Sequence, residues 1–158
     1  MKHLLNILNK LALSIIKEKG DLSIFALSRL SDSDKWNLLI VADWCKSPSR
    51  ESFKYLYEAF KNVCDDYIKG KNKTDIDNEI LEYLEFPFVI LTKESSLIKV
   101  LERKYKGAPI YFSALAINAY SDKKIEEIYL FATDDKTDRS KFEFYEYGRF
   151  SEEYLDKV

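Results

Sequence analysis

The chain has 158 residues, with 25 basic and 27 acidic side chains and a formal net charge of -2 at pH 7. Hydrophobic residues make up 46% of it and charged residues 33%, which excludes a wholly disordered chain and supplies one ordinary packed core. Acidic and basic residues are interleaved, so the sequence does not favour a broad face for binding nucleic acid.

The first 20 residues predict an amphipathic helix. Leucines such as Leu4 and Leu8 recur at helical spacing, and Gly20 follows as a stop signal. Asn6 and Lys10 interrupt the apolar stretch, which is also too short to span a bilayer, so neither a signal peptide nor a membrane anchor is expected. We expect this helix to lie on the core of a protein without membrane contact.

The next part of the chain predicts a hairpin. Residues 22–30 read as a strand, and the polar residues 31–34 read as a turn. Residues 38–42 are a continuous apolar run, which is typical of a strand covered on both faces. We expect this run to be the central strand, with Trp36 and Trp44 bracing its ends.

A helical region and another strand follow. Ser49 predicts the N-cap of a helix that ends near Cys64, and a short helix is expected after Thr74. Residues 86–91 predict a strand with Pro87 at its first positions, where a missing N–H is tolerated. Strand, helix, strand connections of this length favour parallel pairing. A further helix is predicted from Ser95.

The last third predicts a closing hairpin. Residues 109–120 and 125–133 read as two antiparallel strands, and residues 134–158 as a C-terminal extension. We therefore expect a single α/β domain over residues 1–158. Its core is a mixed sheet of about five strands with flanking helices.

These segments also resemble a known family. The chain resembles a family of small prokaryotic α/β proteins to which no activity is assigned. The similar segments are FALSRL, DKWNLLIVADW, EFPFVILTKESSLIKVLERK and IEEIYLFAT. In that family a FAL-x-R strand precedes a DKW strand, and the match runs from about Gly20 to Thr133. Asp43 stands where the family has proline. The resemblance implies the α/β fold and no particular reaction.

Cys45 is the first candidate for chemistry. Trp44, Cys45 and Ser47 are similar to the active-site junction of thioredoxin-like proteins in their C-x-x-S form, and the resemblance implies Pro87 as the cis-proline that faces the thiol. A cysteine at a helix N-terminus has a lowered pKa because unpaired amides and the helix dipole stabilise its thiolate. The alternative is a structural cysteine at the end of a strand, since free cysteine is among the most buried residue types.

Carboxylates offer a second candidate. Asp43, Glu126, Glu127, Asp134 and Asp135 would hold a divalent cation, as in a nuclease, if their strands were adjacent. Solvated surface carboxylates are the simpler interpretation. With one histidine and four glycines, the chain also lacks a multi-histidine metal site and a glycine-rich phosphate loop. We therefore predict no metal and no cofactor.

Aromatic residues of the second half suggest association. Tyr120, Tyr129 and Phe131 lie on the predicted closing hairpin, and tyrosine is enriched at interfaces. An uncovered strand edge invites pairing with a second molecule, so this hairpin predicts a homodimer. Packing of the same aromatic residues in the core is an equal alternative.

The favoured function is a non-catalytic binding or protein-interaction module in the cytoplasm, without a nucleic-acid partner. The alternative is a thioredoxin-like, thiol-dependent protein acting through Cys45, and the third hypothesis is a metal-dependent nuclease. Cys45, Asp43 and Ser47 are the candidate catalytic residues, and Trp44 and Pro87 are the candidate pocket.

Overall fold

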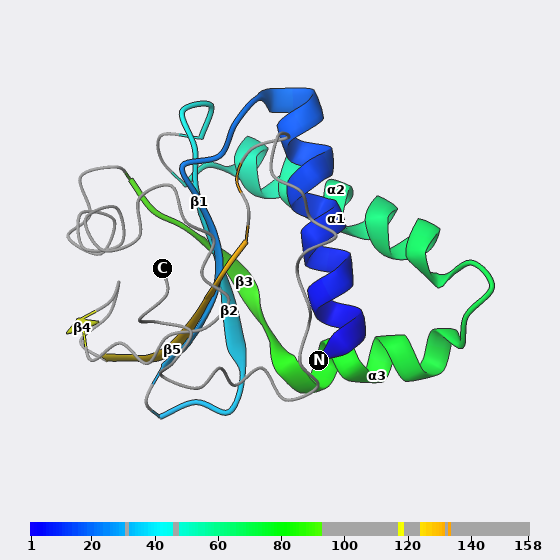
Figure 1. The fold of residues 1–158 in the computed structure, drawn as a ribbon. Coiled ribbons are helices and arrows are strands. Elements are labelled where there is room, and N and C mark those ends of the chain that lie inside the picture. Colours follow the sequence, from blue (N-terminus) through cyan, green and yellow to red (C-terminus); the bar gives the residue numbers. More distant parts are fainter. Residues whose placement is uncertain (31, 46–47, 93–116, 119–123, 132, 134–158) are drawn as a thin grey trace, which may run out of the picture.

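Helices and one mixed sheet make up the fold, as the sequence predicts (Figure 1). The computed structural model describes residues 1–30, 32–45, 48–92, 117–118, 124–131 and 133, with the backbone alone for 117–118 and 124–127. In chain order the elements are α1 (Lys2–Lys19), β1 (Ile24–Leu30), β2 (Trp36–Val41), α2 (Arg50–Ile68), α3 (Lys73–Tyr83), β3 (Leu84–Ile90), β4 (Ile117–Asn118) and β5 (Lys124–Leu130).

The strands form one sheet in the order β3-β2-β1-β5-β4. β1 pairs antiparallel with β2 and with β5, β2 pairs parallel with β3, and the two-residue β4 pairs antiparallel with β5. The parallel pair arises because α2 and α3 carry the chain from the end of β2 back to the start of β3. The predicted mixed sheet is therefore confirmed, but its central position belongs to β1 and not to β2.

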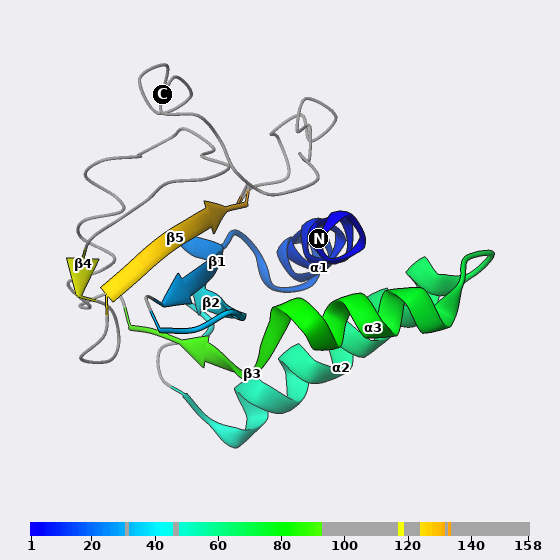
Figure 2. The ribbon, with the colours of Figure 1, turned by 90° about the horizontal axis from the view of Figure 1, so that it is seen from below.

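The described helices all lie on one face of the sheet (Figures 1 and 2). On this face α1 buries a leucine stripe that includes Leu4, Leu8 and Leu11 in one core with Phe25 and Leu27 of β1. The opposite face buries a second apolar cluster: Ile24, Ala26, Leu30, Leu39, Val41 and Ile128. Burial on both faces explains why β2 is a continuous apolar run.

Helix ends follow the sequence signals. Gly20, with a φ of 95°, ends α1, and the Ser49 hydroxyl accepts the Ser52 N–H at 3.1 Å to cap α2. α2 continues to Ile68, one turn beyond the predicted end at Cys64. The predicted helix from Ser95, most of the strand over 109–120 and the extension over 134–158 lie outside the described residues. No helix in the described part is long and apolar enough to cross a membrane.

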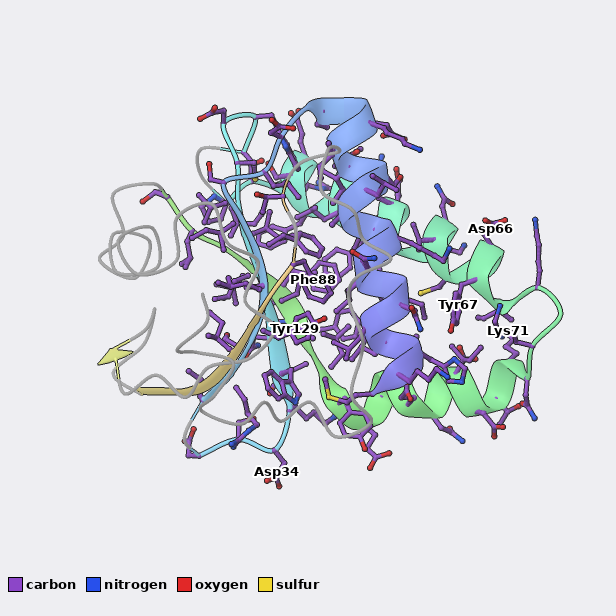
Figure 3. All side chains as sticks on the ribbon, in the orientation of Figure 1. Asp34, Asp66, Tyr67, Lys71, Phe88 and Tyr129 are labelled. Atoms are coloured by element: carbon purple, nitrogen blue, oxygen red, sulfur yellow. The ribbon has the colours of Figure 1, made fainter. Side chains whose placement is uncertain are left out.

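Two of the three aromatic residues predicted at an interface lie in the core. Tyr129 is 2% exposed and Phe131 is 6% exposed, in the same cluster as Phe25 (Figure 3). The rings of Phe25 and Phe131 meet edge-on with centroids 5.5 Å apart. Burial within one chain leaves these two side chains unavailable to a second molecule, so core packing holds for them. Tyr120 lies outside the described residues.

Candidate functional site

Cys45 lies in the core at the end of β2. Its N–H donates to the Ala42 carbonyl at 3.1 Å, which closes a tight turn, and its side chain is only 1% exposed. α2 begins five residues later at Arg50, where Ser49 caps the first turn. Cys45 is therefore outside the helix terminus that would stabilise a thiolate. The sequence departs from the C-x-x-S form as well, because Pro48 stands three residues after Cys45.

Pro87 does not share a pocket with Trp44. Because β2 and β3 run parallel, Pro87 lies near the level of Leu38, whereas Trp44 and Cys45 follow the carboxyl end of β2 beyond Ala42. Four residues of strand, roughly 13 Å, separate the two levels. The peptide bond before Pro87 is cis, yet Pro87 is exposed on the edge of the sheet. The two parts of the predicted thiol site are thus apart.

Trp44 packs over the start of α2. Its ring meets Tyr55 edge-on with centroids 5.3 Å apart, and the Tyr55 hydroxyl donates to Glu18 at 2.8 Å. Burial, and then the hydrogen bond and charge of Glu18, raise the pKa of Tyr55. The buried Nε1 of Trp44 has no hydrogen-bond acceptor among the described residues. Packing therefore holds the indole at this end of β2, and Ser47 lies outside the described residues.

The predicted acids do not converge in the described part. Asp43 is exposed in the turn after β2, and the last residue of β2, Val41, lies opposite Ile24 at one end of β1. In the strand register Glu127 of β5 lies opposite Arg29, near the other end of β1. These two positions are about five residues apart along β1, or roughly 17 Å. The acids at positions 134 and 135 lie outside the described residues. Among the residues that are described, no group of three His, Cys, Asp or Glu side chains is arranged to hold a metal ion.

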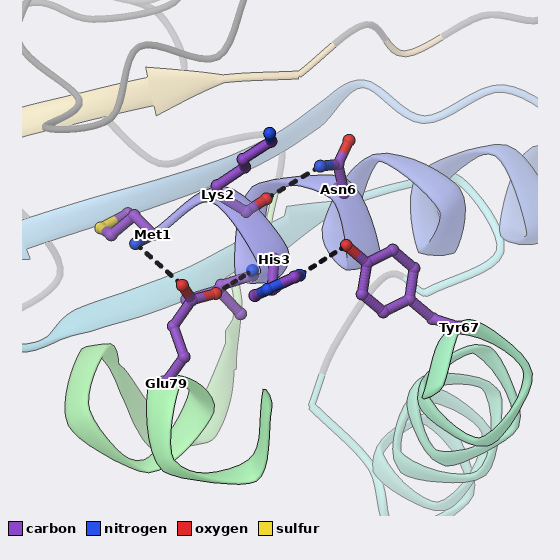
Figure 4. Close-up of polar contacts among 7 residues, drawn as sticks. Met1, Lys2, His3, Asn6, Tyr67 and Glu79 are labelled. Atoms are coloured by element: carbon purple, nitrogen blue, oxygen red, sulfur yellow. Dashed lines mark hydrogen bonds and ion pairs between the residues drawn. The ribbon is translucent and has the colours of Figure 1, made fainter. Parts of the chain in front are cut away.

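A polar cluster clamps the first turn of α1 to α2 and α3 (Figure 4). Glu79 of α3 accepts the Leu4 N–H at 2.6 Å and pairs with the Met1 ammonium group at 3.1 Å. His3 Nδ1 lies 2.7 Å from the hydroxyl of Tyr67, whose pKa is raised by burial. Since α1 has no capping side chain of its own and no acid in its first turn, Glu79 supplies both from another helix.

The edge of the sheet at β3 is different, because it exposes a phenylalanine. Asn37 and Leu39 of β2 are two residues apart, whereas their partners on β3, Glu85 and Val89, are four residues apart. The two extra residues of β3 form a bulge at Phe86 and Pro87. β3 has a paired strand on one side only among the described residues. Phe86 is 42% exposed there. The bulge turns an aromatic side chain outward at an edge of the sheet where the described residues add no further strand.

Rings from α2 and β3 support Phe86 from beneath. Its ring centroid lies 5.9 Å from that of Tyr57, 6.1 Å from that of Phe60 and 5.3 Å from that of Phe88. Phe88 is buried and stacks on Tyr57 at 4.7 Å, which joins the group to the core (Figure 3). We call Phe86, Tyr57 and Phe60 the β3 ring surface. Ring contacts of this kind hold each side chain in place, so the surface is preorganised.

One other large hydrophobic side chain of the described part is exposed. Leu81 on α3 is 64% exposed. Single exposed aliphatic residues are common on protein surfaces, whereas an aromatic residue on a rigid apolar base is typical of a contact site. The β3 ring surface is therefore the candidate functional site, and Leu81 serves as its natural control.

Comparisons of the chain with protein-family models, with curated proteins and with solved structures found no match. The resemblance to the small prokaryotic α/β family stays a prediction. The candidate site rests on the geometry of the β3 edge.

Sequence reasoning missed the β3 ring surface. Tyr57 and Phe60 lie inside the helix predicted from Ser49 to Cys64, and Phe86 is the first residue of the strand predicted over 86–91. Pro87 was the available signal, because proline within a strand marks an edge and so marks its neighbours as accessible. Glu79 was missed too, since no local pattern shows that a side chain caps a distant helix.

Proposed function

We propose that this chain is a non-catalytic protein-interaction module that forms a homodimer. The supporting observation is the β3 ring surface, where Phe86 stands 42% exposed on a base of packed aromatic rings. Aromatic residues in such settings contribute a large part of binding free energy because they bury much area and lose little side-chain freedom.

The chemistry of this surface is recognition. It presents the exposed Phe86 ring, which half-buried Tyr57 and buried Phe60 support. We propose the β3 ring surface as the interface of the homodimer, at the edge of the sheet opposite to the hairpin of Tyr129 and Phe131. A cytoplasmic location belongs to the same proposal, supported by the two free cysteines, Cys45 and Cys64.

Sedimentation velocity from about 1 to about 100 micromolar chain tests the proposal, since this range spans the affinities of weak and moderate interfaces. We expect a concentration-dependent mass above the 18.6 kDa of one chain. Phe86→Ser should weaken association by about tenfold or more, because a central aromatic side chain is lost. Leu81→Ser removes a more exposed apolar residue, 64% against 42%, from α3 and should change association little.

A mass of 18.6 kDa at every concentration contradicts the proposed homodimer. Equal weakening by both substitutions would show that association depends on general surface hydrophobicity and not on the β3 ring surface. Circular dichroism of both variants checks that the fold is kept.

A further inference from the structure

We draw no further inference here: the strongest candidate, the apolar cluster around Ala26, Leu39 and Ile128 on the sheet face opposite to the described helices, carries none because nothing in the described part of the chain shows what covers it.

Discussion

At the scale of single residues, burial decides what the two thiols can do. Cys45 is 1% exposed, and Cys64 is 8% exposed on the inner side of α2. Burial, and then the charges of Asp65 and Asp77, raise the pKa of Cys64 to about 12. Since the thiolate is the reactive form, a raised pKa and a buried sulfur both lower reactivity.

We expect both native thiols to react with an aromatic disulfide reagent at least about a hundredfold more slowly than in denaturant, because the core must open before either sulfur is reached. Between pH 7 and about 9 the native Cys64 thiol stays protonated, so its rate should rise less with pH than that of an unfolded thiol. Single variants, Cys45→Ser and Cys64→Ser, assign the rates. A native Cys45 as fast as a free cysteine would favour the thiol-dependent hypothesis.

Phe86 shows at the same scale how position separates two similar side chains. Phe86 and Phe88 are two residues apart on β3, yet Phe88 is buried while Phe86 is 42% exposed. The bulge at Pro87 makes the difference, because it adds residues to β3 that have no partner on β2. Residue type alone predicts burial for both.

At the scale of elements, α1 depends on α3 for its cap. The first turn of α1 holds no acid and no capping side chain, and Glu79 supplies a carboxylate to the Leu4 N–H and to the Met1 ammonium group. The unpaired amides and positive end of the helix dipole are stabilised by this carboxylate. A contact between elements thus takes the place of a local sequence signal.

Removing this carboxylate should destabilise the fold. We expect Glu79→Ala to lower the free energy of unfolding by about 1 to 2 kcal/mol, because the buried Leu4 N–H loses its acceptor. Glu82→Ala is the matched control, since Glu82 is exposed on the same helix, and its effect should stay below about 0.5 kcal/mol. Urea unfolding at neutral pH measures both. Equal effects of the two substitutions would mean that the contacts of Glu79 with Leu4 and Met1 add nothing to stability beyond helix propensity.

At the scale of the whole molecule, one core joins the helices to the sheet and includes the end of β5. Phe131 lies in that core with Tyr129 and Phe25. We expect Phe131→Ala to lower the free energy of unfolding by about 3 kcal/mol or more, because it leaves a cavity. Phe86→Ala, at the half-exposed ring, should cost about 1 kcal/mol.

The same two variants separate stability from association. Chemical unfolding should respond mainly to Phe131→Ala, and sedimentation mainly to Phe86→Ala. If Phe131→Ala left stability unchanged and reduced the mass of the assembly, its assignment to the core would be contradicted.

Much of the fold was predictable, because its signals are local. Four signals act over a few residues and agree with the structure: the apolar spacing in α1, the Gly20 stop, the Ser49 cap and the turn before Trp36. The candidate site was not predictable in this way. Phe86, Tyr57 and Phe60 come from two elements that are brought together only by the return of the chain through α3.

The sequence by itself determined the kinds of the described elements, both ends of α1, the start of α2 and the mixed character of the sheet, because periodicity and capping depend on near neighbours along the chain. The tertiary structure decided that β1 takes the centre, that Tyr129 and Phe131 are core, that Cys45 is buried and that Phe86 is exposed. These outcomes depend on strand order, register and one bulge, which are set by contacts between residues far apart in the sequence.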